Sequence, residues 1–312
     1  MEGPLPWPQR SGNNEVSRVQ GVRFSYADAF SRNLGWVTEA EQERLRCARV
    51  AVAGMGGVGG VHLLTLARLG IGRFAIADFD RFDIANFNRQ VGASLQTLGR
   101  PKAEVLREMV LDINPEADVT VFADGLGPAN LDAFLAGADV YLDGLDFFAF
   151  DVRQAVFRRC AQRGIPAVTV APLGMGAALV NFVPGGMGFD DYFGWRDGMG
   201  ELDKALHFVV GLSPWAPHIG YLVDRSRVNL AERRGPSTMI ACQICAGVAG
   251  AEVLKLVLGR GDVIAAPRSV QFDAYRNKLV TAWRPGGHRH PLQRLALAIS
   301  RRKLAALQGG AP

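Results

Sequence analysis

The sequence has few cysteines, no internal repeat and no low-complexity tract. Four cysteines in 312 residues cannot make a disulfide framework, so a reducing cytoplasm is the expected compartment. The sequence also lacks a large excess of either charge, because 35 Lys and Arg residues against 30 Asp and Glu residues leave a net charge of only +5. This mild excess fits an anionic ligand such as a nucleoside triphosphate, and it permits nucleic acid without requiring it.

Hydrophobic runs of the kind that target or anchor a protein are scarce as well. The start, MEGPLPWPQRSGNNEVSRVQ, has no basic segment followed by an apolar run, and its polar, Pro-rich composition predicts a disordered arm over residues 1–20. One long apolar run lies at 238–258. Glu252 and Lys255 interrupt it, which favours a buried helix in a core or subunit interface over a transmembrane segment.

Strand and helix patterns alternate through the first half of the chain. Short apolar strands are expected at 49–53, 73–78, 118–123, 139–146 and 165–172, and helical patterns stand between them, including one over 102–113. This alternation is typical of a parallel sheet with helices on both faces. We therefore predict an α/β, Rossmann-like, doubly wound and mostly parallel sheet in a domain over 21–184.

The composition of the sequence changes after residue 184. Residues 184–203 are Gly-rich and aromatic without a period, which predicts an irregular crossover loop. The apolar helix and two short strands around a turn at Arg276 and Asn277 complete a segment over 185–284. A basic amphipathic tail follows over 285–312, with Arg301, Arg302 and Lys303 together. That cluster fits a solvated helix face, or docking to nucleic acid, an acidic partner or a membrane surface.

A glycine-rich turn between the first strand and its helix points to a nucleotide. Residues 54–60 read GMGGVGG, and glycine lets the backbone turn tightly and come close to phosphates at a helix start. Asp78 ends the next strand, where a carboxylate can hold ribose hydroxyls. The expected nucleotide-binding glycines are Gly54, Gly56, Gly57 and Gly59.

Further polar residues follow the strands at the same edge of the sheet. Arg89 stands in the stretch ADFDRFDIANFNRQ, Lys102 opens the next helix, and Asp146 ends a later strand. Arg and Lys can bind β- and γ-phosphates, and an Asp can hold Mg²⁺. This combination suits attack at the α-phosphate of ATP with pyrophosphate leaving. The same stretch adds Asp80, Asn86 and Gln90 as nucleotide-binding candidates.

An NAD-dependent oxidoreductase on the same fold is the alternative. The glycine turn and Asp78 would serve it equally well. Hydride transfer would, however, give no role to Asn86, Arg89 and Lys102.

These motifs together resemble the ThiF/MoeB/HesA group, prokaryotic relatives of the ubiquitin-activating enzymes. The resemblance rests on GMGGVGG, ADFDRFDIANFNRQ, GRPKAE, INPEADV and LDGLD in this order, and it covers about residues 25–184. It implies ATP- and Mg²⁺-dependent adenylation of a carboxylate, usually in a homodimer. It also implies that an arginine near the N-terminus reaches the phosphates of the partner subunit, and Arg32 is the matching residue.

The chain departs from that group in its cysteines. Members often bind a structural zinc through two CxxC pairs, whereas only Cys242 and Cys245 form such a pair here, so we predict no zinc. Residues 176–236 contain no cysteine, which argues against a covalent thiol step in the crossover loop. Between Asp146 and Arg153 the chain carries about two extra residues, and the FFAF segment there either shapes a different acceptor pocket or packs in the core.

The acceptor itself has no signature in the sequence. The carboxylate could be the C-terminus of a small sulfur-carrier or ubiquitin-like protein, a peptide, a small molecule, or a threonylcarbamoyl group on tRNA as in the dehydratase branch of the group. A non-catalytic nucleotide-binding partner subunit is a further alternative.

Overall fold

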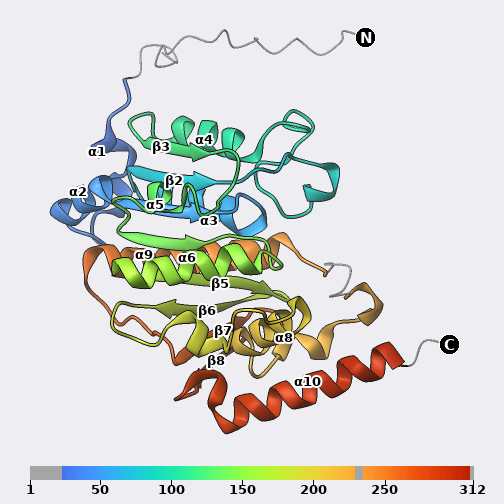
Figure 1. The fold of residues 1–312 in the computed structure, drawn as a ribbon. Coiled ribbons are helices and arrows are strands. Elements are labelled where there is room, and N and C mark those ends of the chain that lie inside the picture. Colours follow the sequence, from blue (N-terminus) through green and yellow to red (C-terminus); the bar gives the residue numbers. More distant parts are fainter. Residues whose placement is uncertain (1–22, 229–234, 310–312) are drawn as a thin grey trace, which may run out of the picture.

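The centre of the molecule is one eight-stranded sheet with the order β3-β2-β1-β4-β5-β6-β7-β8 (Figure 1). The computed structural model describes residues 23–228 and 235–309, with side chains up to residue 302. Strands β1 to β5 run parallel, and β6 to β8 extend one edge in antiparallel pairs. The predicted mostly parallel sheet and C-terminal strands are therefore confirmed. The bounds are β1 (Arg49–Ala53), β2 (Arg73–Ala77), β3 (Asp118–Phe122), β4 (Val140–Asp143), β5 (Ala167–Leu173), β6 (Gly176–Phe182), β7 (Arg268–Asp273) and β8 (Lys278–Trp283).

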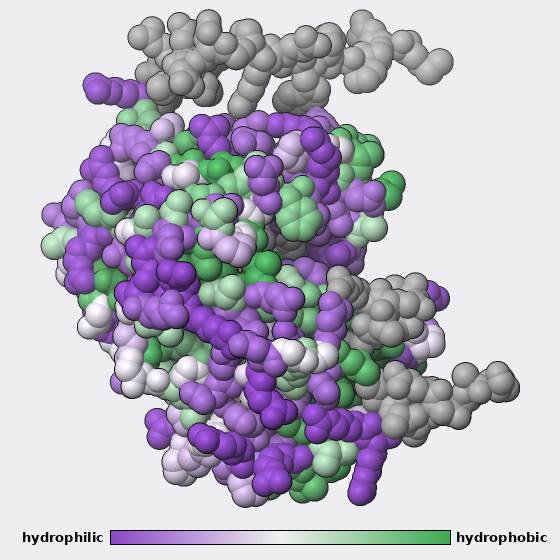
Figure 2. All heavy atoms as spheres, in the orientation of Figure 1, coloured by the Kyte–Doolittle hydropathy of each residue, from purple (hydrophilic) through white to green (hydrophobic). Residues whose placement is uncertain are grey.

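Each face of the sheet has its own hydrophobic core, because successive strand residues point to opposite faces. In β1, Val50 and Val52 pack in the cluster that includes α3 (Gly57–Arg68), α4 (Lys102–Ile113) and α9 (Met239–Leu258). Ala51 and Ala53 pack in the second cluster, with α5 (Leu131–Phe134), α6 (Phe150–Arg163), α7 (Phe189–Phe193) and α8 (Glu201–Leu212). The outer side of this second layer is largely hydrophilic in Figure 2. The sheet is thus covered on both sides, as a doubly wound fold requires.

The prediction of an irregular loop over 184–203 is wrong where α7 and the start of α8 lie. α7 has only five residues between Gly188 and Gly194, too few to show a helical period in the sequence. Its side chains Phe189, Tyr192 and Phe193 are all buried in the second core. The aromatic residues of this segment thus form core. Strand β6, which precedes the segment, is not among the predicted strands.

Helix α9 agrees with the predicted buried helix. It packs against α3, β5 and β6, and Cys245, Ala249 and Val253 enter the first core. By length and composition it is also the one helix among the described residues that could cross a membrane. The predicted turn between the last two strands is confirmed, since Asn277 has a φ of 51° between β7 and β8.

The C-terminal tail forms the helix α10 (Pro291–Gly309), as predicted. It packs against α8, with Leu297 buried and Leu292, Leu295 and Ile299 exposed. Arg301 donates a 2.9 Å hydrogen bond to Asp203 of α8, so one member of the basic cluster is held by the protein itself. Docking of this tail to a partner, and the boundaries at 184 and 285, stay predictions. The predicted arm over 1–20 lies outside the described residues.

Candidate functional site

A cavity of about 370 Å³ lies at the carboxyl ends of β1, β2, β4 and β5. Strand ends at one edge of a parallel sheet are the usual position for a ligand. The lining brings together most of the site residues predicted from the sequence. They are Gly54, Gly56, Gly57, Asp78, Asp80, Arg89, Gln90, Lys102 and Asp146.

The glycines of the β1–α3 turn have two different roles. Gly54 has a φ of 86°, and a Cβ there would overlap the carbonyl oxygen of Gly144. A Cβ on Gly59 would likewise overlap the Gly54 carbonyl, so these two glycines allow close packing of the turn against the end of β4. Gly56 is different, because a Cβ there would meet only Gln90 Nε2 at 3.7 Å. Gly56 therefore keeps space open in the cavity, at the start of α3, where backbone N–H groups favour an anion.

Asp78 supports this turn from the end of β2. Its Oδ2 accepts a 2.6 Å hydrogen bond from the backbone N–H of Met55, and its Oδ1 accepts one of 2.7 Å from Asp80. Burial raises the pKa of the Asp78 carboxyl, while these two bonds act in the opposite direction. Each carboxylate oxygen has room for a further donor, so Asp78 can hold ribose hydroxyls from the position predicted for it.

Lys102 supplies a buried positive charge to the cavity. It is the first residue of α4, and its Nζ lies 2.9 Å from Asp80 Oδ2. The Lys102 side chain is 7% exposed, whereas that of Asp80 is 53% exposed. An ammonium has three donors, so one bond to Asp80 leaves Lys102 able to bind phosphate oxygens.

Arg89 and Gln90 extend the polar wall. Arg89 Nη1 donates to the Ala85 carbonyl at 2.9 Å and to Asn88 Oδ1 at 3.0 Å. Gln90 is 7% exposed, and its Oε1 has no hydrogen-bond partner. A buried acceptor without a donor is costly. A donor on a ligand in this cavity would therefore satisfy Gln90.

Asn86 does not lie among the cavity residues that the structure describes. It ends the short 3-10 helix η2 (Ile84–Asn86), and its Oδ1 accepts a 2.9 Å hydrogen bond from the Asp83 backbone. Asp83 in turn accepts from Ala85. The side chain predicted to bind nucleotide thus stabilises the loop that carries Arg89.

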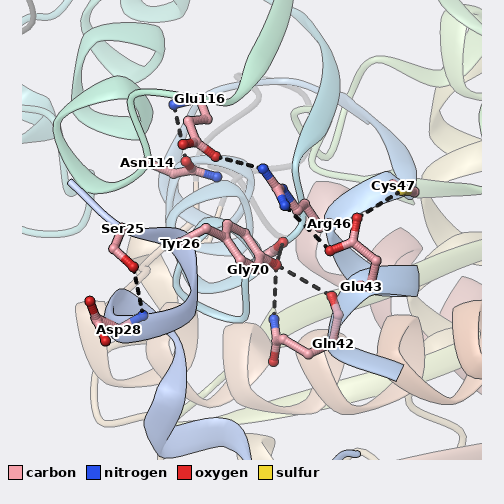
Figure 3. A network of polar contacts seen from close by, with 10 residues as sticks. All are labelled: Ser25, Tyr26, Asp28, Gln42, Glu43, Arg46, Cys47, Gly70, Asn114 and Glu116. Carbon is pink, nitrogen blue, oxygen red and sulfur yellow. Dashed lines mark hydrogen bonds and ion pairs between the residues drawn. The ribbon is translucent and has the colours of Figure 1, made fainter. Parts of the chain in front are cut away.

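Arg32 is also distant from the cavity of its own chain. It lies in η1 (Ser31–Asn33) and is exposed. Tyr26 donates a 2.5 Å hydrogen bond to the Gly70 carbonyl (Figure 3), and Asn33 donates one of 3.1 Å to Leu69. These contacts place Arg32 beside the C-terminal end of α3. The glycine turn is at the other end of this 12-residue helix, about 18 Å away.

Asp146 is exposed in the loop between β4 and α6 and lines the cavity. Its Oδ1 accepts a 2.9 Å hydrogen bond from the Phe148 backbone. The loop is held by Arg153, whose guanidinium donates to the carbonyls of Leu145, Asp146 and Phe147 at 2.8, 3.0 and 3.1 Å. Sequence reasoning gave Arg153 no role. The available signal was its position early in the helix that follows LDGLD.

Asp143 anchors Arg153 from the end of β4. Arg153 Nε donates to Asp143 Oδ2 at 2.8 Å, and Thr169 donates to the same oxygen at 3.0 Å. The side chains of this ion pair are 3% and 2% exposed. The pair is therefore part of the framework that positions Asp146.

Of the two cysteines in the CxxC pair, Cys242 is among the described cavity residues and Cys245 is not. Cys242 lines the cavity beside Gly57, where a Cβ would lie 3.1 Å from the Cys242 Sγ. Burial raises the pKa of both Cys242 and Cys245. Within the described residues, no three His, Cys, Asp or Glu side chains gather as a metal site. The absence of zinc stays a prediction.

His207 and His218 are not among the cavity residues that the structure describes. His207 Nδ1 lies 2.7 Å from the Phe193 carbonyl. His62 of α3 is fully buried and is also not a cavity residue.

Comparisons with known proteins agree with this fold and sequence pattern. The tRNA threonylcarbamoyladenosine dehydratase of Bacillus subtilis (strain 168) is 35% identical over 150 residues, which are 48% of this chain and 57% of that protein. The probable adenylyltransferase/sulfurtransferase MoeZ of Mycobacterium tuberculosis (strain ATCC 25618 / H37Rv) is 32% identical over 236 residues, which are 75% of this chain and 53% of that protein. The chain thus spans about half the length of these curated relatives.

A likeness in structure accompanies the likeness in sequence. The crystal structure of E. coli MccB with ATP matches with a TM-score of 0.59 and 20% identity, over 81% of this chain and 69% of that chain. At this identity the match shows a shared fold. Residues 30–295 match the ThiF family, and the chain therefore belongs to that family.

Proposed function

We propose that the protein uses ATP and Mg²⁺ to adenylate a carboxylate, which gives an acyl-adenylate and pyrophosphate. The observation that carries this proposal is one cavity in which the glycine turn and Asp78 adjoin Arg89, Lys102 and Asp146. Hydride transfer to or from NAD would need the first two features only. The ATP named for the MccB structure and the adenylyltransferase named for MoeZ support the same activity.

Each residue along this edge of the sheet has a separate role in the proposed reaction. Asp78 holds the ribose, and Gly56 leaves room for the nucleotide beside the start of α3. Arg89 and Lys102 bind the β- and γ-phosphates and neutralise the charge of the departing pyrophosphate. A carboxylate oxygen attacks the α-phosphorus, and the bond from that phosphorus to the bridging oxygen breaks. Catalysis of this kind depends on positioning and charge neutralisation.

Asp146 fits the proposed metal ion. It is an exposed carboxylate at the cavity, and the Phe148 N–H occupies only one of its oxygens. Mg²⁺ takes one or two carboxylates together with water and phosphate oxygens. When bound, the ion would supply Lewis-acid polarisation of the phosphates. Arg153 contributes by holding the Asp146 loop in place.

The active form is proposed to be a homodimer, because Arg32 is too far from its own cavity to serve there. Its anchors lie at the opposite end of α3 from the glycine turn. Only another subunit could bring an Arg32 side chain to the phosphates. Apolar residues of α9 that stay partly or largely exposed, such as Ile240 and Val248, can join two copies.

We propose no covalent cysteine step and a cytoplasmic location. Residues 176–236 contain no cysteine, and burial raises the pKa of Cys242, which makes its thiol a poor nucleophile. The acceptor is a protein or peptide C-terminus, a small acid, or a threonylcarbamoyl group on tRNA. Relatives named for the carrier protein ThiS and for the tRNA modification represent two of these classes.

Two measurements test this function. Calorimetry should show that the protein binds ATP with Mg²⁺ and does not bind NAD. ATP–pyrophosphate exchange should then appear with a suitable carboxylate, and Asp146→Asn should abolish exchange while the protein still binds ATP. Binding of NAD in place of ATP, or unchanged exchange in Asp146→Asn, would refute the proposal.

A further inference from the structure

The strand order sets the order in which the binding residues follow one another along the cavity. Its lining runs from β2 through β1 and β4 to β5, a span of about 14 Å at the usual strand spacing. Asp78 follows β2, the glycine turn follows β1, and Asp146 follows β4. The nucleotide therefore occupies the β2–β1 side. The carboxylate that attacks its α-phosphate must enter from the β5 side of Asp146.

That β5 side is apolar. We call its residues the apolar half of the cavity: Leu145, Phe147, Phe148, Leu173, Phe208 and Val209. The rings of Phe147 and Phe148 lie 4.8 Å apart, and Phe147 lies 5.5 Å from Phe208. Phe148 is only partly buried, so part of its ring is available to a bound group.

No free cationic side chain serves this half among the described lining residues. Arg89 and Lys102 belong to the nucleotide side. Arg153 is committed to Asp143 and to three loop carbonyls, and its guanidinium also lies 4.8 Å from the Phe208 ring. The Thr169 hydroxyl donates to Asp143. An anionic group near the reacting carboxylate would find no cationic partner among the lining residues that the structure describes, whereas an apolar group would displace water from aromatic surface.

We propose that the acceptor is a carboxylate whose α-carbon carries a large apolar side chain, seated against Phe148 in the apolar half. The inference rests on the proposed function and specifies its substrate class. An acceptor that ends in glycine has no side chain on the α-carbon and would leave the apolar half filled with water. Such an acceptor could be a polypeptide C-terminus or a free acylated amino acid, which share this chemistry.

The test measures ATP–pyrophosphate exchange with a panel of acceptors. The peptides are Gly-Gly-Gly-X with Gly, Leu, Phe or Asp at the last position, and N-acetyl-leucine represents the small acid. We expect kcat/KM to be about tenfold or more higher with Leu or Phe than with Gly or Asp. Activity with the peptide alone would identify a polypeptide end, and equal activity with N-acetyl-leucine would identify a small acid.

Variants of Phe148 connect this preference to the structure. Phe148→Ala should lower the ratio of the Leu peptide to the Gly peptide, and Phe148→Arg should shift the preference toward Asp. The gain with Asp remains readable even if the alanine variant folds poorly. Trp283→Ala, which removes an exposed ring from β8 outside the cavity, is the matched control and should leave the ratio unchanged.

The possible results separate the two proposals. Exchange that is fastest with the Gly or Asp peptide would overturn the apolar acceptor and would support adenylation. No exchange with any acceptor, by a protein that binds ATP with Mg²⁺, would also overturn the apolar acceptor. Failure to bind ATP at all would overturn the proposed function itself.

Discussion

Arg153 joins the end of β4 to the loop that carries Asp146. Its Nε donates a 2.8 Å hydrogen bond to the buried Asp143 carboxylate, and its two Nη atoms donate to the carbonyls of Leu145, Asp146 and Phe147. One side chain thus satisfies a buried charge and fixes three consecutive residues. The Asp146 carboxylate accepts its hydrogen bond from the Phe148 backbone and not from Arg153, so its position depends on the backbone that Arg153 holds.

Replacement of Arg153 should destabilise the protein strongly. Arg153→Ala leaves the Asp143 carboxylate buried without its charge partner, and we expect the free energy of unfolding to fall by about 3–5 kcal/mol in urea denaturation. Arg159→Ala is the control, because the side chains of the Arg159–Asp132 pair are 41% and 61% exposed. Its cost should stay within about 1 kcal/mol. Equal costs for the two variants would show that Arg153 is not a structural anchor.

Two glycines of the same turn should respond differently to alanine. Gly54→Ala meets a φ of 86° and the Gly144 carbonyl, so it should lower the free energy of unfolding by about 2 kcal/mol or more. Gly56→Ala has space for its methyl group and should change stability by less than about 0.5 kcal/mol. The methyl group would, however, enter the nucleotide space, so calorimetry should show at least about tenfold weaker ATP binding. Normal ATP affinity in Gly56→Ala would place the nucleotide elsewhere.

Arg89 and Lys102 should distinguish ATP from AMP. Loss of a charged hydrogen bond typically costs about 1.5–3 kcal/mol, or roughly 10- to 100-fold in affinity. We expect this loss for ATP in Arg89→Ala and Lys102→Ala, and little change for AMP, which lacks the β- and γ-phosphates. Calorimetric titration with both nucleotides is the measurement. An equal loss for AMP would mean that these side chains support the fold or the ribose site.

His62 should make stability depend on pH. Burial lowers the pKa of His62 from 6.5 to about 3, so between these values the unfolded chain binds a proton that the folded protein excludes. Stability should therefore fall as pH decreases below 6.5, by about 2 kcal/mol at pH 5 relative to pH 7. The His62→Leu variant has no imidazole to protonate at this position, so the free energy of unfolding of the variant should change less over the same pH interval. Parallel pH profiles for the two proteins would contradict a neutral buried His62.

The sheet and much of the nucleotide site could be predicted because their signals are local. The strand 49–53 and the helix 102–113 match β1 and α4 residue for residue. Asp78, Lys102 and Asp146 were placed by their positions at strand and helix ends, which a parallel sheet brings to one edge. Such residues can be located from the order of the elements alone.

The remaining features depend on contacts between distant segments. Phe208 reaches the cavity because α8 packs against α6, and no spacing in the sequence indicates that contact. Asn86 has the residue type of a ligand-binding group, yet local capping holds it in η2. The position of Asn86 in the sequence predicts that it lies near the site. Its role in capping η2 is visible only in the hydrogen bonds of the structure.

Arg32 gives the sharpest test of the proposed dimer, because it should act only across subunits. Arg32→Ala and Lys102→Ala homodimers should each show little exchange activity, since every site lacks one group. After the two are mixed and allowed to reassociate, half of the dimers pair unlike subunits, and each of these has one complete site. Activity should then recover to about a quarter of the wild-type value, as the symmetry of a two-site dimer requires. If Arg32 served its own subunit, every site would still lack one group and mixing would restore nothing.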